Sequence, residues 1–181
     1  QVCETHLQTL RELQPHGPYY LMGYSLGGTL AQGIAARLEA VGEKVAFLGL
    51  LDTWPPETQN WAEKGANELD PAVLDEINRE RAAFVAAQQG QASGALFEAI
   101  ERNYGDAVRL LTTAQSVPFA GKATLFVAER TLPEGMDPQK TWAPWIGELD
   151  VFGLDCAHVD IISPNSFEEI GPVLQRVLAF D

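Results

Sequence analysis

A serine flanked by glycines lies close to the start of the chain, in Gly23-Tyr24-Ser25-Leu26-Gly27. A serine hydroxyl is a weak nucleophile, so covalent chemistry requires a neighbouring base and a group that orients this base. Glycines beside such a serine leave room for a strained turn that exposes the hydroxyl. The pattern therefore predicts that Ser25 is the nucleophile of an acyl-transfer reaction, although the motif alone has modest specificity.

The chain has three histidines that could supply the base. His6 and His16 precede the serine, in a predicted helix or at its exit, and we expect them to be solvated surface residues. His158 lies in a loop between the last predicted strand and the last predicted helix. Because such loops gather at the carboxyl ends of parallel strands, His158 is the candidate base. The alternative for His158 is a capping or surface role.

Two carboxylates are candidates for the acid that orients the histidine. Asp52 ends the strand that follows the serine and its helix, and it points towards the same sheet edge as Ser25. Glu129 ends the next strand, where many hydrolases place the acid. A carboxylate at the end of a strand can also cap a helix or remain in water. Topology alone favours Asp52 only slightly.

The elements around these residues predict a parallel α/β sheet. An apolar strand at 19–24 precedes the serine, a helix at 26–41 follows it, and a continuous apolar strand covers 45–51. Strand–helix–strand is the unit of such a sheet, and a strand, turn and helix around Gly-x-Ser-x-Gly are the setting of an α/β-hydrolase nucleophile elbow. The other predicted elements are strands at 122–128 and 148–154, a loop at 131–145, and helices at 2–14 and 166–180.

The middle of the chain has a different character. Helices are predicted at 71–89 and 94–115, with no strand of their own. Two helices between consecutive strands are more than a crossover needs, although crossover packing is the alternative. We interpret the insertion, at about 57–116, as a helical lid over an active site.

Composition limits the classes of partner. The formal net charge of −13 argues against nucleic acid or an anionic membrane. The longest uninterrupted apolar run, at 45–51, is too short to span a bilayer, and no signal peptide is visible. Two cysteines, Cys3 and Cys156, make no disulfide framework, which predicts a reduced, cytoplasmic protein. No cluster suggests a metal, so Cys156 is expected to be a bystander.

The chain resembles the thioesterase domains of nonribosomal peptide synthetases through almost its whole length. The segments that carry the resemblance are Gly23-Tyr24-Ser25-Leu26-Gly27-Gly28-Thr29-Leu30-Ala31, Gly49-Leu50-Leu51-Asp52-Thr53-Trp54, Pro55-Pro56-Glu57-Thr58, Val117-Pro118-Phe119 and Cys156-Ala157-His158-Val159-Asp160. The resemblance implies one domain over 1–181 with the α/β-hydrolase fold, a mostly parallel sheet flanked by helices. It also implies that Ser25 is the nucleophile, His158 the base and Asp52 its orienter.

The resemblance further implies a substrate class. The substrate would be an acyl or peptidyl thioester on the phosphopantetheine arm of a peptidyl carrier domain in the same synthetase, with no cofactor bound directly by this domain. Release would use an internal nucleophile, which would cyclise a dihydroxybenzoyl-serine trimer to a trilactone siderophore. The alternatives are simple hydrolysis, as by an editing thioesterase or an esterase, and a non-catalytic module that docks a carrier domain.

The front of the chain departs from the family pattern. These domains carry further strands before the nucleophile strand, and a loop there supplies one amide of the oxyanion hole. This chain supplies the other amide, the backbone N–H of Leu26. We therefore expect an N-terminally incomplete domain, cut from a longer polypeptide, with an unpaired apolar sheet edge. Low stability or activity is expected unless the remaining part is present.

Overall fold

The computed structural model describes residues 2–58 and 113–178. Residues 1–58 and 115–181 form one compact unit, and residues 59–114 form a second. The elements below belong to the first unit. Most of the predicted lid at 57–116, including the helix predicted at 71–89, lies outside the described residues.

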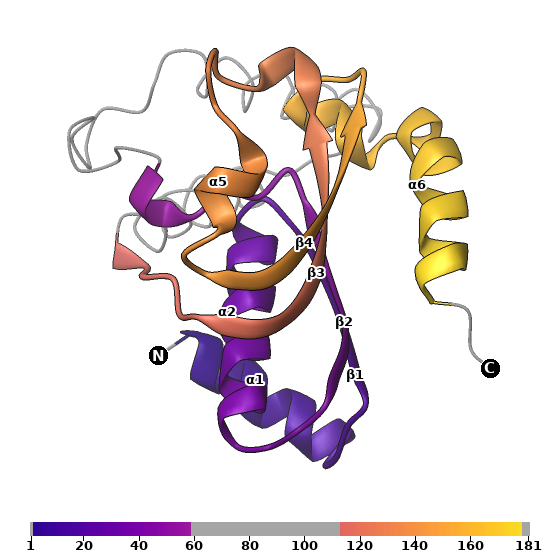
Figure 1. Cartoon of the computed structure of the whole chain (residues 1–181). Coiled ribbons are helices and arrows are strands. Elements are labelled where there is room, and N and C mark those ends of the chain that lie inside the picture. Colours follow the sequence, from indigo (N-terminus) through magenta and orange to yellow (C-terminus); the bar gives the residue numbers. More distant parts are fainter. Residues whose placement is uncertain (1, 59–112, 179–181) are drawn as a thin grey trace, which may run out of the picture. The chain divides into compact units, whose positions relative to one another are not determined.

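Within the described residues, four parallel strands form one sheet in the order β1-β2-β3-β4 (Figure 1). The strands are β1 (Tyr19–Tyr24), β2 (Val45–Leu51), β3 (Phe119–Ala128) and β4 (Ile146–Leu154). Because neighbouring strands are parallel, their carboxyl ends lie at one edge of the sheet. The apolar runs in β2 and β3 are buried, as expected for a sheet that helices cover on both faces.

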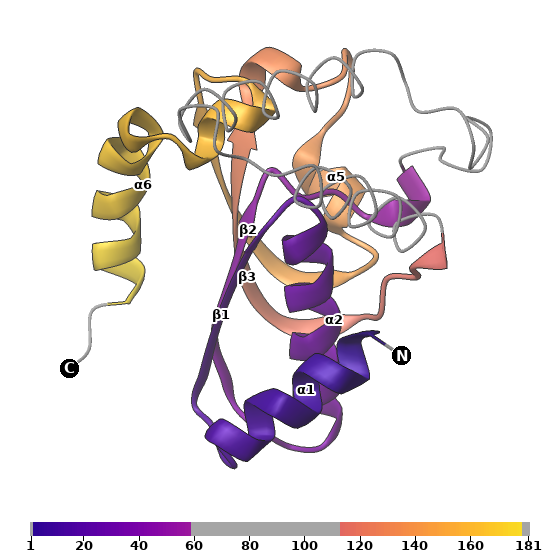
Figure 2. The same cartoon turned by 180° about the vertical axis from the view of Figure 1, so that it is seen from behind.

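Helices α1 (Val2–Leu13) and α2 (Leu26–Ala40) cover one face of this sheet, and α6 (Pro164–Val177) covers the other (Figures 1 and 2). Successive residues of β3 point into the two cores, because side chains alternate along a strand. Leu125 packs on the side of α2, and Phe126 packs on the side of α6. No helix in the described part of the chain is long and apolar enough to cross a membrane.

Three short 3-10 helices follow the carboxyl ends of the strands. These helices are η1 (Pro56–Thr58) after β2, η2 (Glu129–Thr131) after β3 and η3 (His158–Ile162) after β4. Two of the predicted site residues therefore begin such a turn: Glu129 begins η2 and His158 begins η3. The carboxyl edge of the sheet is thus where the candidate residues gather.

Several predicted boundaries need correction. β3 and β4 begin earlier than predicted, with a register shift between Phe119 and Lys122. The predicted loop at 131–145 contains a short helix, α5 (Pro138–Trp142). Its start has a clear local cause, since the Asp137 carboxylate caps the helix by accepting from the Lys140 N–H, and a proline at the first position suits a helix start. α6 begins at Pro164 rather than 166 for the same kind of reason, with a capping serine before it.

Candidate active site

The turn between β1 and α2 holds Ser25 in a backbone conformation that side-chain-bearing residues rarely adopt. Its φ is 50° and its ψ is −121°. The Ser25 N–H donates to the Leu51 carbonyl at 3.0 Å, and the Ser25 carbonyl accepts from the N–H groups of Gly28 and Thr29 at 3.0 and 3.3 Å. Such strain persists only where the surroundings fix the backbone. The turn therefore has the strained form predicted for a nucleophile elbow.

Two glycines at this turn leave space that a side chain could not share, and of these only Gly23 belongs to the motif. A Cβ on Gly23 would lie 2.2 Å from the carbonyl oxygen of Gly27. A Cβ on Gly28 would lie 1.9 Å from the Thr53 hydroxyl oxygen. A Cβ on Gly27 would meet no atom within 4 Å. The expectation that both motif glycines make room for the turn is therefore wrong for Gly27, whereas Gly28 makes room for the Thr53 side chain.

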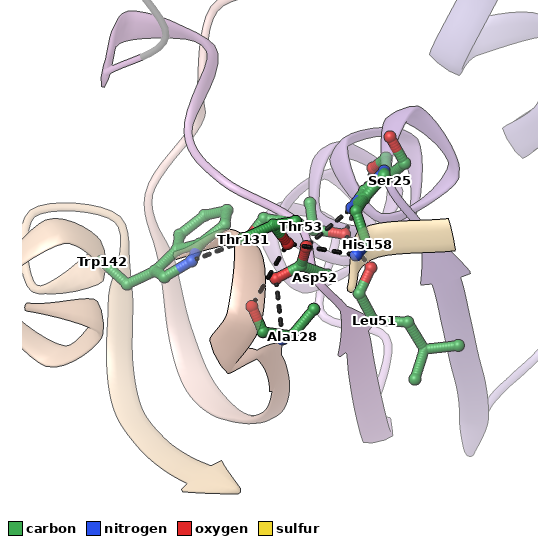
Figure 3. Close-up of polar contacts among 8 residues, drawn as sticks. All are labelled: Ser25, Leu51, Asp52, Thr53, Ala128, Thr131, Trp142 and His158. Atoms are coloured by element: carbon green, nitrogen blue, oxygen red, sulfur yellow. Dashed lines mark hydrogen bonds and ion pairs between the residues drawn. The ribbon is translucent and has the colours of Figure 1, made fainter. Parts of the chain in front are cut away.

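Asp52 follows β2 and points its carboxylate at His158 (Figure 3). Its Oδ2 lies 2.6 Å from His158 Nδ1, and its Oδ1 accepts from the Ala128 N–H at 3.1 Å. Asp52 is 6% exposed and has a positive φ of 40°. In the tautomer of a neutral imidazole that donates from Nδ1 to this carboxylate, Nε2 carries the lone pair. The pair thus orients an imidazole that can act as a base.

Two further contacts hold His158. Its backbone N–H donates to Thr131 Oγ1 at 3.0 Å. Its ring lies against the ring of Tyr24, with centroids 4.8 Å apart and an interplanar angle of 31°. Tyr24 directly precedes Ser25, so this contact brings the imidazole beside the elbow. Sequence reasoning missed both partners; Tyr24 could have been suspected from its place in the motif, whereas nothing in the sequence singles out Thr131.

Hydrogen bonds and an ion pair connect the segment before His158 to η2. The Arg130 N–H donates to the Cys156 carbonyl at 3.1 Å, and the Arg130 guanidinium binds both carboxylate oxygens of Asp155 at 2.8 and 3.0 Å. This guanidinium lowers the pKa of Asp155. Because the pair is exposed, it contributes little stability. It helps to fix the path of the loop that ends at His158.

The other candidate residues lie apart from this pair. The Glu129 carboxylate covers Gly153, where a Cβ would lie 2.0 Å from Glu129 Oε1. Within the described residues, Glu129 makes no hydrogen bond to His158. His16 pairs with Glu43 at 3.0 Å, beside the start of β1 and far from the carboxyl edge of the sheet. The structure therefore brings Asp52, and not Glu129, to His158.

Ser25 is less tightly connected to this group. Within the described residues, its hydroxyl makes no hydrogen bond, so Ser25 is not joined to His158 by one. Catalytic hydrogen bonds are often long before substrate binds and shorten in the complex. Leu26 begins α2, and its N–H has no acceptor among the described residues, as expected in the first turn of a helix. This N–H is the oxyanion donor that the sequence predicts.

Cys156 has the environment of a core residue. It is 8% exposed and packs in the cluster beneath α6, and this burial raises the pKa of its thiol. Among the described residues, no three His, Cys, Asp or Glu side chains gather as a metal-binding group. The thiol is therefore neutral and enclosed near neutral pH.

The chain is similar to known synthetases and thioesterases. It is 75% identical over 178 residues to enterobactin synthase component F of Escherichia coli K12, which covers 98% of this chain and 14% of that protein. It is 45% identical over 184 residues to vanchrobactin synthetase VabF of Vibrio anguillarum, covering 98% of this chain and 6% of that protein. The chain thus spans a small part of the curated relatives it matches.

The fold is also similar to that of a solved thioesterase structure. The NocB thioesterase domain, in covalent complex with a fluorophosphonate nocardicin G analog, matches 99% of this chain and 74% of that chain, with a TM-score of 0.70 and 20% identity. This likeness identifies the architecture of the described unit as the α/β-hydrolase fold. The family model of the thioesterase domain matches residues 1–175. Because this match spans nearly the whole chain, the chain belongs to the thioesterase domain family.

Proposed function

We propose that this chain releases an acyl or peptidyl group from a thioester through a covalent intermediate on Ser25. The observation that carries the proposal is the 2.6 Å contact between the buried Asp52 carboxylate and His158 Nδ1, at the sheet edge that also carries the strained Ser25 turn. A buried carboxylate that holds an imidazole in one tautomer is what a serine nucleophile requires of its base.

The first half of the reaction forms the acyl-enzyme. His158 Nε2 takes the hydroxyl proton of Ser25 while Oγ attacks the thioester carbonyl carbon, and the carbonyl π electrons move onto its oxygen. The Leu26 N–H donates to this oxyanion. As the C=O bond reforms, the C–S bond breaks, and His158 returns the proton to the departing thiolate. The products are a Ser25 ester and a free thiol, and no cofactor is bound directly by this chain.

We propose that the thiol is the phosphopantetheine arm of a peptidyl carrier domain. The 75% identity to a region of enterobactin synthase component F supports this substrate class, since that protein is a synthetase of which this chain matches 14%. The arrangement of Ser25, Asp52 and His158 suits any acyl thioester and does not select the thiol that carries the acyl group. The carrier is therefore the part of the proposal that rests on the relatives.

The second half of the reaction decides the product. A hydroxyl of the acyl chain attacks the Ser25 ester while His158 takes its proton. The bond between Ser25 Oγ and the acyl carbon then breaks, His158 returns the proton to Ser25 Oγ, and a cyclic ester leaves. The relative named for enterobactin synthesis supports this course, with a trilactone siderophore as product. Hydrolysis differs only in that water replaces the hydroxyl. Mass spectrometry of the products from a synthetic seryl-ester trimer thioester separates the two, because the linear acid is one water heavier than the lactone.

Fluorophosphonate labelling tests the nucleophile. We expect the purified protein to gain one phosphonyl group on Ser25, located by peptide mass spectrometry, and Ser25→Ala to gain none. Thr9→Val is a matched control, because Thr9 is a hydroxyl residue on the exposed side of α1. No adduct on the folded protein would favour a non-catalytic module that docks a carrier domain.

A further inference from the structure

Thr53 lies directly after Asp52 and contacts the backbone of the elbow. It is 1% exposed. Its hydroxyl oxygen is 3.2 Å from the Ser25 carbonyl oxygen and 3.2 Å from the Leu51 carbonyl oxygen (Figure 3). A hydroxyl has one proton to donate, so Thr53 shares it between these two acceptors. The residue next to the predicted acid therefore binds the backbone of the predicted nucleophile.

Thr53 is itself held in place by buried groups. The indole N–H of Trp142 donates to the Thr53 carbonyl at 3.1 Å, and the Trp142 side chain is 1% exposed. The Thr53 side chain occupies the space where Gly28 lacks a Cβ. Threonine is also stiff about χ1, because its Cβ carries two heavy atoms. The hydroxyl thus has a fixed position from which to bind Ser25.

The bond to the Ser25 carbonyl acts on the neighbouring N–H. The Ser25 carbonyl and the Leu26 N–H belong to one peptide unit, which is planar and trans, so the two groups point in opposite directions. Whatever fixes the direction of the carbonyl fixes the direction of the Leu26 N–H as well. A hydrogen bond accepted by the carbonyl also polarises the peptide and strengthens its N–H as a donor.

We infer that Thr53 is a positioning residue that aims the Leu26 N–H at the oxyanion. The inference rests on the proposed function, in which this N–H stabilises the tetrahedral intermediate. The N–H groups of Gly28 and Thr29 also bind the Ser25 carbonyl, but both belong to α2. Thr53 directly follows Asp52 after β2, so its bond links the Ser25–Leu26 peptide to the segment that carries Asp52 and fixes nucleophile and acid relative to one another.

The expected loss of kcat on removing the Thr53 hydroxyl follows from its role in aligning the Leu26 N–H. Removing an oxyanion donor outright typically costs about a hundred- to a thousandfold in kcat. Losing its alignment, while the donors of Gly28 and Thr29 remain, should cost less. We therefore expect Thr53→Val to lower kcat about tenfold. The KM should change by less than about twofold, because the oxyanion exists only after the thioester has bound.

The experiment compares Thr53→Val, which keeps the shape and loses the hydroxyl, with Thr53→Ser, which keeps the hydroxyl. kcat and KM are measured with an N-acetylcysteamine thioester, and the inhibition constant is measured for phenylboronic acid, which forms a tetrahedral adduct with a serine hydroxyl. Thr124→Val is the matched control, because Thr124 is 2% exposed in β3. We expect Thr53→Val to lower kcat and weaken boronate inhibition about tenfold, and Thr53→Ser and Thr124→Val to stay within about twofold of the parent.

A second readout does not depend on activity. The ¹⁵N resonance of the Leu26 amide responds to hydrogen bonding at the Ser25 carbonyl, so Thr53→Val should shift it more than Thr124→Val does. If Thr53→Val does not fold, Thr53→Cys against Thr53→Ser gives the same comparison, since the pair differs only in sulfur against oxygen.

The two possible failures are distinguishable. An unlabelled Ser25 in the parent protein contradicts the proposed function, and the Leu26 resonance then still tests the hydrogen bond. A labelled parent with an unchanged kcat in folded Thr53→Val overturns the inference alone. Equal losses of kcat in Thr53→Val and Thr53→Ser also overturn it, because they would show a packing role.

Discussion

The carboxylate of Asp52 lies 2.6 Å from the imidazole of His158, although 106 residues separate the two in the chain. Asp52 follows β2 and His158 begins the turn after β4, so parallel strands bring both to one edge of the sheet. β3 lies between these strands, and its Ala128 N–H binds the other carboxylate oxygen. The Asp52 carboxylate, on a residue with a positive φ of 40°, is therefore held through both of its oxygens.

Asp52→Asn should strongly reduce turnover and leave the fold intact. The amide keeps the size of the carboxylate but removes its charge and favours the wrong imidazole tautomer. In a well-studied serine protease the equivalent change lowers kcat about ten-thousandfold, and we expect a loss on the order of a thousandfold or more. Steady-state kinetics with a synthetic thioester, together with thermal unfolding, measure the two effects separately.

Glu129→Gln is the matched control for that change. Glu129 also follows a strand, but its carboxylate covers Gly153 and makes no hydrogen bond to His158 within the described residues. Turnover should stay within about twofold of the parent, since surface changes away from the reacting groups have small effects. A larger loss in Glu129→Gln than in Asp52→Asn would show that the acid has been assigned to the wrong strand.

The sequence predicted the sheet edge well because a simple rule governs it. Ser25 and Asp52 each follow an apolar run that is predicted to be a buried strand, His158 lies in the loop after the last predicted strand, and the carboxyl ends of parallel strands meet. That rule does not decide whether Asp52 or Glu129 contacts His158, because the contact depends on how far the loop after β4 reaches back over the sheet. The contact with His158 is a property of this loop and of the backbone at Asp52.

The supporting contacts were less predictable. Thr53 binds Ser25 across 28 residues, and Trp142 binds Thr53 across 89, so both contacts depend on strand register and on the short helix α5. A two-residue shift in strand register would remove them without changing which side chains face the core. The requirement for glycine at position 28 is equally hard to predict from the sequence, since it arises from the Thr53 side chain and not from the local turn.

Gly28→Ala should destabilise the protein much more than Gly27→Ala. A Cβ at position 28 would lie 1.9 Å from Thr53 Oγ1 and 2.7 Å from Thr53 Cβ, whereas one at position 27 would meet no atom within 4 Å. Overpacking of a buried contact costs about 1–3 kcal/mol, and we expect about 2 kcal/mol for Gly28→Ala. Gly27→Ala should be neutral or stabilising by a few tenths of a kcal/mol, because alanine favours helices. Urea unfolding of both variants decides the point, and equal midpoints would contradict the geometry of the elbow.

Ser25→Gly should be more stable than Ser25→Ala, although neither variant can form an acyl-enzyme. Both remove the hydroxyl, but only glycine relaxes the φ of 50°. A residue in such a region costs about 1–3 kcal/mol, and the greater freedom of unfolded glycine offsets about 0.4–1 kcal/mol of the relief. We expect a net difference of about 1 kcal/mol, or about 2–4 °C in Tm, measured by calorimetry. If Ser25→Ala melts at the same temperature or higher, the turn is not strained.

Cys156 should react with iodoacetamide far more slowly than Cys3 in the native protein. Cys156 is buried and Cys3 is partly exposed, and burial raises the pKa of the Cys156 thiol while its hydrogen bond with Ser166 opposes the rise. A raised pKa means less thiolate at any given pH, and the thiolate is the reactive form. We expect alkylation at pH 8, followed by peptide mass spectrometry, to be at least about tenfold slower at Cys156, and the difference to vanish in denaturant.

The same shift predicts how stability changes at alkaline pH. The folded state holds the Cys156 proton more tightly than the unfolded state, so its contribution is fully present below the unfolded pKa of about 8.5 and is lost as pH rises through the higher folded pKa. Cys156→Ala should therefore flatten the decline in unfolding free energy above about pH 8.5. A decline as steep in Cys156→Ala as in the parent protein would assign the alkaline sensitivity to other groups. Retained turnover in Cys156→Ala would, in addition, separate this core thiol from the chemistry of His158, two residues away in the chain.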